Sequence, residues 1–471
     1  MLKSINLSDK GLLLISLFTV VVCSIAGANI LYLLGLLIFA YLYSLWGKDF
    51  VINFVIISSL TLVSDLGASL RLAVNIVSIS ALLFLFLNKY GFNLEKYPAV
   101  NSTVLLYLFA LILLMVLTSF TSNDTFAGLI LTAKTITFFV LIYFFYSLIN
   151  GEKEINLFRN SIITASIVLV LFALFNMIRL GQSIFDINTW IYLRFSGLIG
   201  NPNGTAAFYA ISIPLITGKI LTTSMKKIKI YIPILIILII GLLFTVSRGA
   251  FLSLAVSITF YFFFMYRKVL IKSVIISAIL ITLIVLVPTL NETFTALIRL
   301  EEGVSQRDIL WELAINMIAD NFWLGIGPGS FTNEMFNYIP VMLDSWHGIF
   351  LQGLADVTQG SNLAHNFYLS FFSEMGILGL VASVILPGIF FNIGYKTMKY
   401  YKDFDKAKYI NTLIMLSIGV GLFIRGFFEG INLITFGWIT MDLPFWLVFA
   451  SLLYYYEQSK ISSGRNLVGI K

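Results

Sequence analysis

Residues 225–250, MKKIKIYIPILIILIIGLLFTVSRGA, combine a basic end, an apolar run and a single arginine. The apolar run at 229–246 is long enough to cross about 30 Å of hydrocarbon as a helix. Lys226, Lys227 and Lys229 stand at its start, and Arg248 follows its end. Because short cytoplasmic loops retain basic residues, the lysine end predicts the cytoplasmic side. The segment therefore predicts a membrane helix that runs outward and ends beside an arginine.

Apolar runs of this kind recur along the whole chain of 471 residues. Hydrophobic residues make up 59% of the sequence and charged residues 11%, and the mean hydropathy is +0.96. A soluble domain of this length could not bury so much apolar surface. We therefore predict one all-α, polytopic membrane domain spanning residues 1–471. The single cysteine, Cys23, excludes a disulfide framework and a thiolate metal site.

Hydropathy over 19-residue windows predicts 12 to 14 membrane helices, since the shortest candidates can be re-entrant segments or paired hairpins. The candidate spans are residues 11–28, 29–46, 51–66, 72–88, 102–120, 127–149, 157–178, 205–224, 229–246, 250–265, 270–289, 366–395, 408–424 and 432–455.

The basic residues orient these spans with both termini in the cytoplasm. This orientation places 19 of the 20 lysines on the inner side, and it leaves eight basic residues on the outer side or within the membrane. Those eight are Arg71, Lys134, Arg179, Arg194, Arg248, Arg299, Arg307 and Arg425. Arginine presents a planar fork suited to bidentate phosphate contacts, so the bias predicts an outer cavity for an anionic headgroup. The alternative is that each arginine reaches the interface or pairs with an acid such as Asp65, Glu301 or Glu429.

The longest hydrophilic stretch, residues 291–364, is predicted to be a large extracytoplasmic loop. It contains an amphipathic pattern at 307–319, in which Ile309, Leu310, Leu313, Met317 and Ile318 share one helical face. Such a helix could lie on the outer surface and roof a cavity. A glycine-rich segment follows at 325–330, where no strand precedes it and no lysine stands in P-loop spacing. We therefore expect a turn there rather than a phosphate loop.

Three short motifs predict an outer site. Asn201-Pro-Asn203-Gly204 is a helix-start signal near Arg194, and free helix N–H groups together with arginine favour phosphate. Arg248 lies in a tight turn between two apolar runs, and a charge so close to hydrocarbon is a functional hypothesis. His365 stands where the outer loop re-enters the membrane. Its imidazole could serve as a general base, although a lone histidine at a helix start is more often structural.

These motifs together resemble the O-antigen ligase and O-antigen polymerase superfamily. The resemblance rests on Arg194 with Asn201-Pro-Asn203, Ser247-Arg-Gly249, the Gly325–Gly329 turn, and Ala364-His-Asn366 followed by Glu374-Met-Gly376. It covers residues 190–395, and the earlier spans agree only in general character. Each motif is weak alone, but the four stand in the family's order.

The resemblance implies a membrane glycosyltransferase of the bacterial plasma membrane whose active site faces the outside. Its donor would be a glycan on undecaprenyl pyrophosphate, and its acceptor a hydroxyl of the lipid A core or another surface glycan, in the ligase type. In the polymerase type the acceptor is another lipid-linked repeat unit. No metal or other cofactor and no nucleic-acid partner is implied, and the anomeric centre would be inverted.

Carried onto this chain, the resemblance makes His365 the catalytic base and gives Arg248 a catalytic role. Arg194 and Arg248 would bind the pyrophosphate. Supporting roles are implied for Asn201, Asn203, Asn366 and Glu374. No motif frames His347, which we therefore expect to be dispensable.

Two other classes of protein share this composition. Metal-dependent polytopic glycosyltransferases hold a cation with paired acids in the first outer loop, but the corresponding connection here, residues 26–29, contains no acid. Transporters of lipid-linked oligosaccharides commonly show internal repeats and broken helices at the midplane. No repeat is visible in this chain, and its polar motifs gather in the second half at one face. Individual residues do not distinguish a ligase from a polymerase. The group of motifs as a whole favours the ligase type only slightly.

Overall fold

The structure is a computed structural model that describes residues 47–61, 68–183, 195, 201–297, 307–338 and 364–468. Every regular element within these ranges is a helix, which confirms the all-α prediction. Ten of the described helices are long and apolar enough to cross a membrane. The predicted spans 11–28 and 29–46 lie outside the described residues.

The ten candidate spans follow the predicted hydropathy segments closely. They are α4 (Ser102–Ser119), α5 (Thr125–Leu148), α6 (Glu152–Arg179), α8 (Pro202–Thr222), α9 (Met225–Thr245), α10 (Arg248–Met265), α11 (Arg267–Leu286), α16 (Phe367–Phe404), α17 (Lys406–Arg425) and α18 (Ile439–Val468). A further helix, α3 (Ala68–Tyr90), carries a shorter apolar stretch, Asn75–Tyr90.

The predicted start of the last span, residue 432, is wrong by seven positions, because residues 432–438 form a loop before α18. Asn432 has φ 82°, Phe436 has φ 44° and Gly437 has φ 81°, all in the left-handed region that a helix excludes. The Asp442 carboxylate holds this loop, since it accepts hydrogen bonds from both the backbone N–H and the hydroxyl of Thr435. Hydrogen bonds to α18 therefore stabilise the conformation of this loop.

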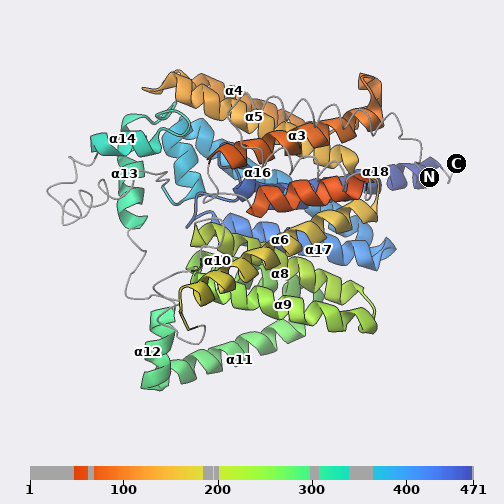
Figure 1. The fold of residues 1–471 in the computed structure, drawn as a ribbon, viewed down its shortest axis with the longest axis vertical. Coiled ribbons are helices and arrows are strands. Elements are labelled where there is room, and N and C mark those ends of the chain that lie inside the picture. The colour runs from red at the N-terminus through yellow and green to blue at the C-terminus, as the bar shows by residue number, and fades with distance from the viewer. Residues whose placement is uncertain are drawn as a thin grey trace.

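The helices form a bundle in which α17, α8 and α18 are the most deeply buried (Figure 1). Helices α3, α4 and α5 lie on one side of α16 and α18, and α8, α9 and α10 lie on the other. Helix α17 contacts α10, α16, α8 and α18. Its Gly421 allows the close approach of α10, because a Cβ atom there would lie 2.4 Å from the Ser253 carbonyl oxygen. Helix α11 lies at the edge of the bundle.

Three shorter helices follow α11 along the chain: α12 (Pro288–Leu297) lies beside α11, whereas α13 (Arg307–Asp320) and α14 (Phe331–Tyr338) lie together against α16 (Figure 1). Helix α13 confirms the amphipathic prediction. All five residues of the predicted apolar face, Ile309, Leu310, Leu313, Met317 and Ile318, are buried. Four of them, all but Ile318, pack with Phe331 and Met335 of α14 and with Ala364, which precedes α16, in a small core separate from that of the bundle. This core fixes α13 beside the start of α16.

Candidate functional site

The glycine-rich segment 325–329 is a structural turn that packs on α16, as the sequence predicted. The backbone N–H groups of Ile326 and Gly327 donate to the carbonyl oxygens of Ser373 and Glu374. Gly325 has φ 68°, and a Cβ atom at this position would lie 2.4 Å from the Glu374 carbonyl carbon. The fully buried Glu374 carboxylate accepts a hydrogen bond of 3.4 Å from the Phe331 N–H. Glu374 therefore fastens this turn to α16.

His365 directly precedes Asn366, the N-cap residue of α16. Its φ is 46°, a left-handed conformation that is uncommon outside glycine and often found at functional sites. Asn366 caps the helix, because its side-chain oxygen accepts hydrogen bonds from the N–H groups of Tyr368 and Leu369. The cap and the turn before it hold the imidazole at the helix start, and its side chain remains 33% exposed.

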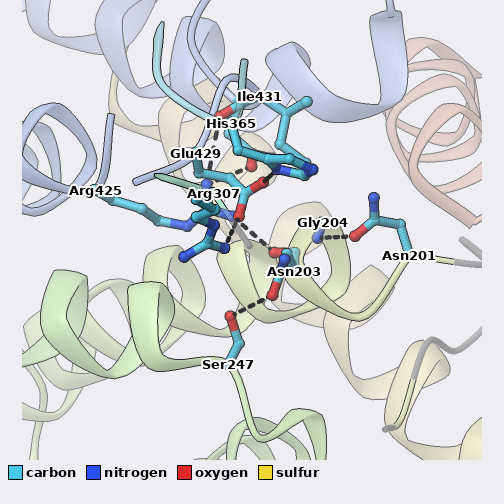
Figure 2. A network of polar contacts seen from close by, with 10 residues as sticks. Asn201, Asn203, Gly204, Ser247, Arg307, His365, Arg425, Glu429 and Ile431 are labelled. Carbon is cyan, nitrogen blue, oxygen red and sulfur yellow. Dashed lines mark hydrogen bonds and ion pairs between the residues drawn. The ribbon is translucent and has the colours of Figure 1, made fainter. Parts of the chain in front are cut away.

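Glu429, from the loop after α17, holds the His365 ring (Figure 2). Its Oε1 atom lies 2.7 Å from the His365 Nδ1 atom, and its Oε2 atom accepts a hydrogen bond of 3.1 Å from Arg307 of α13. The Glu429 side chain is only 3% exposed. Burial raises the pKa of this carboxyl, but His365, Arg425 and Arg307 lower it by more, and the resulting pKa is about 2. Glu429 is therefore a carboxylate at every physiological pH.

The carboxylate determines what the imidazole can do. An ionised carboxylate only accepts hydrogen bonds, so it favours the tautomer with the proton on the His365 Nδ1 atom. The lone pair then lies on Nε2, the other ring nitrogen. An imidazole oriented in this way by a buried carboxylate can accept a proton from a hydroxyl at Nε2, and Glu429 stabilises the imidazolium that forms.

Arg425, the last residue of α17, acts on Glu429 through its charge and hydrogen-bonds to the Asn201-Pro-Asn203 motif. It is buried, and it donates to the Asn432 side chain at 2.6 Å and to the Asn203 carbonyl oxygen at 2.9 Å. The Asn203 side-chain oxygen accepts a hydrogen bond of 2.9 Å from the Ser247 hydroxyl. Figure 2 shows the hydrogen bonds from Arg425 through Asn203 to Ser247, beside the contacts of Glu429 with His365 and Arg307. The network connects segments that lie more than 200 positions apart in the sequence.

Arg248 is the first residue of α10, and it is half-buried. Its neighbour Gly249 lies against Arg425, since a Cβ atom on Gly249 would be 3.7 Å from the Arg425 Cγ atom. Asn201 caps α8, because its side-chain oxygen accepts from the Gly204 N–H at 3.0 Å. The starts of α8 and α10 therefore meet at Arg425, and both helices direct their N-terminal N–H groups to this end of the bundle.

The structure thus brings the Asn201-Pro-Asn203, Ser247-Arg-Gly249 and His365 motifs together around Arg425 and Glu429. Glu374 is not part of these contacts, because it lies in α16, nine positions after His365 in the sequence. Arg307 and Arg425, for which the sequence indicated no role, belong to the network, and Arg307 pairs with an acid as the alternative interpretation proposed. Residues Arg194, Arg299 and His347 and the side chain of Arg71 lie outside the described part. Arg179 is exposed at the end of α6.

Sequence reasoning missed the role of Glu429. The sequence nevertheless contained an indication of this role. Arg425 and Glu429 follow closely after the predicted span 408–424, and charges so close to hydrocarbon are often functional. What could not be deduced was that Glu429 binds a histidine 64 positions earlier. Within the described ranges, no three His, Cys, Asp or Glu side chains gather in a way that could hold a metal ion.

Comparison with known families finds a match for part of this chain. Residues 233–384, which include Arg248, Arg307 and His365, match the family model described as O-antigen ligase. This part of the chain, about a third of its length, is similar to an O-antigen ligase domain. The match confirms the resemblance to the O-antigen ligase and polymerase superfamily, and no curated protein matches the chain. The match and the apolar helices support a multi-pass membrane protein of the O-antigen ligase or polymerase type, a class of glycosyltransferases that acts on lipid-linked glycans.

Proposed function

We propose that this O-antigen ligase-type enzyme transfers a glycan from undecaprenyl pyrophosphate to an acceptor hydroxyl at the outer face of the bacterial plasma membrane. The observation that carries the proposal is the hydrogen bond of 2.7 Å between His365 and the buried carboxylate of Glu429. It orients a base at a helix start where the charge of Arg425 acts on the same carboxylate, and hydrogen bonds link Arg425 through Asn203 to Ser247, the residue before Arg248. A base and a phosphate-binding cation are the two groups that the transfer requires.

In the proposed reaction the acceptor oxygen attacks the anomeric carbon of the donor sugar. The His365 Nε2 atom takes the hydroxyl proton as the new glycosidic bond forms. The bond between the anomeric carbon and the pyrophosphate oxygen breaks, and undecaprenyl pyrophosphate departs with the electron pair. Attack from the face opposite the leaving group inverts the anomeric centre. The proton on His365 is later released to water, which restores the base.

The negative charge that develops on the leaving group requires stabilisation. Arg248 supplies a fixed positive charge at the N-terminus of an 18-residue helix, whose dipole also favours an anion. Arg194 would provide a second guanidinium group. Such preorganised groups in a poorly hydrated site can stabilise a pyrophosphate leaving group without a divalent cation. We therefore propose a metal-independent reaction, in which full activity persists in excess chelator.

An acceptor-dependence assay tests the proposal. Purified protein in detergent receives an undecaprenyl-pyrophosphate-linked glycan, and free undecaprenyl pyrophosphate is measured with and without acceptor. We expect release only when acceptor is present, since transport would leave every covalent bond intact. Arg248→Ala should weaken donor binding and reduce transfer at normal membrane abundance. Near-normal transfer by this variant contradicts the assignment of Arg248.

The acceptor class separates the ligase from the polymerase. We propose the ligase type, with a lipid A core or another surface glycan as acceptor, because the family description of residues 233–384 is that of an O-antigen ligase. Deletion of the gene should then leave long glycan chains on the lipid carrier. A polymerase would instead leave single repeat units on the finished acceptor, and that phenotype would reassign the chain.

A further inference from the structure

A large cavity lies between α3, α5 and the loop that precedes α18. Its volume is about 810 Å³, within the range of pockets that bind small molecules. The described residues that line it include the apolar side chains of Ile76, Ile79, Ile130 and Leu131. It lies on the α3–α5 side of the bundle, whereas Arg248 lies at the start of α10 on the other side (Figure 1). This cavity is therefore separate from the proposed pyrophosphate site.

Lys134 is the one charged side chain among the described residues that line the cavity. It is exposed, and no carboxylate of the described residues lies within ion-pair distance of its ammonium group. It stands nine residues after Thr125, where α5 begins, which places it about 14 Å along the helix. A cation within a membrane helix is costly unless a partner neutralises it. Among the described residues, Lys134 therefore has no anionic partner.

The wall opposite Lys134 is non-helical backbone. Gly437 has φ 81°, and a Cβ atom there would lie 2.7 Å from the Lys134 Cβ atom and 2.6 Å from its carbonyl carbon. The loop thus lies directly against α5 at this lysine. Asn75 and Thr137 add polar groups to the lining. Non-helical backbone at membrane depth is tolerated where protein buries it or where it lines a polar cavity. The cavity consequently has one polar, cationic region beside an apolar wall.

We propose that this cavity binds a phosphate-bearing lipid, with its phosphate at Lys134 and its chains along the apolar wall of Ile76, Ile79 and Ile130. Lysine is a common phosphate ligand, and a bond between an ammonium group and a phosphate is a charge-assisted hydrogen bond. The apolar side chains provide a surface for acyl or prenyl chains. The proposal concerns binding only, and it does not depend on the transfer chemistry at His365.

Native mass spectrometry of the full-length protein tests this binding. The purified protein is incubated with vesicles that contain phosphatidylglycerol, undecaprenyl phosphate or diacylglycerol, and retained lipid is counted. We expect retention of at least one phosphate lipid, and Lys134→Gln should lower it about tenfold or more, the loss of one charge-assisted hydrogen bond. Lys134→Arg should retain the lipid, since the charge is kept. Lys96→Gln, at an exposed lysine outside the cavity, is the matched control and should change nothing.

A second variant blocks the cavity without removing the charge. Thr137 is exposed in the cavity and bonds only to the Ala133 carbonyl oxygen of its own helix, so Thr137→Phe adds bulk with little effect on packing. It should also lower lipid retention. If Lys134→Gln lowers the retention of phosphatidylglycerol, the bound lipid is a phospholipid. If it lowers the retention of undecaprenyl phosphate, the bound lipid is a prenyl carrier. The proposal is overturned if the wild type and Lys134→Gln retain both phosphate lipids equally. It is also overturned if the wild type retains diacylglycerol as well as it retains the phosphate lipids.

Discussion

Replacing Glu429 with glutamine should abolish most transfer through the tautomer of His365. The substitution preserves the shape of the side chain but gives it one acceptor oxygen and one NH₂ donor. In the native protein one carboxylate oxygen faces Arg307 at 3.1 Å and the other faces His365 at 2.7 Å. The arginine can only donate, so the amide oxygen of the substituted side chain must face Arg307. The NH₂ group then donates to the His365 Nδ1 atom.

That arrangement moves the imidazole proton to Nε2, the atom that must accept the acceptor's proton. A general base contributes about 10²- to 10⁴-fold to a reaction rate, and we expect Glu429→Gln to lower kcat by about that factor. The KM for the donor should change little, because neither arginine that we propose to bind the pyrophosphate is altered. The assay is steady-state transfer by purified enzyme, with membrane abundance and thermal unfolding of each variant as folding controls.

A double variant separates this explanation from a merely structural one. Arg307→Met in the Glu429→Gln background removes the donor that fixes the amide, so the amide can rotate and present its oxygen to His365. The double variant should therefore be about tenfold or more faster than Glu429→Gln alone, a non-additive effect expected for contacting residues. Transfer at the wild-type rate by Glu429→Gln, or a double variant slower than the single one, would refute the tautomer argument.

Three further predictions follow from the same contacts. The pKa of Glu429 is about 2, below the usual value of 4.5, so the ionised carboxylate stabilises the fold above pH 4.5 and this stabilisation is lost as the pH falls towards 2. The thermal midpoints of the wild type and Glu429→Gln should therefore approach each other as the pH falls from 4.5 to 2. Arg425→Lys cannot span both Asn432 and Asn203, and each lost hydrogen bond should cost about 1.5–3 kcal/mol of unfolding free energy, measured by denaturation in detergent. Gly376 lies at a kink within α16, where its φ is 64° and a Cβ atom would lie 2.2 Å from the Trp323 carbonyl oxygen, so Gly376→Ala should strongly lower the thermal midpoint. Gly388→Ala, beyond this kink and with nothing within 4 Å, should not.

Local sequence patterns predicted the local structure well. Hydropathy located the described membrane helices, and the helical period of apolar residues predicted the buried face of α13. The absence of a lysine in P-loop spacing correctly indicated that residues 325–329 form a turn. These predictions succeeded because each depends on residues within a few turns of one another, where helix geometry alone relates sequence position to location.

The contacts between distant segments could not be predicted in the same way. Arg425 looked like one more basic residue at the end of a span, yet it binds Asn203, which is 222 positions earlier. Glu429 was visible only as an acid that an arginine could pair with. Its bond to His365 depends on how the loop after α17 packs against the start of α16, and no periodicity encodes that packing. The same loop explains the late start of α18, because the left-handed residues Asn432 and Phe436 interrupt an apolar run that hydropathy treats as continuous.

The most direct test of the account is transfer by His365→Ala, measured together with donor binding. Purified wild type and variant are given saturating donor and acceptor, and released undecaprenyl pyrophosphate is measured. Donor affinity is determined separately on the same preparations, and His347→Ala serves as the control histidine. The account predicts a loss of transfer of about 10²-fold or more with donor affinity within about threefold of wild type, and no effect of His347→Ala. Transfer by His365→Ala at near the wild-type rate would contradict it.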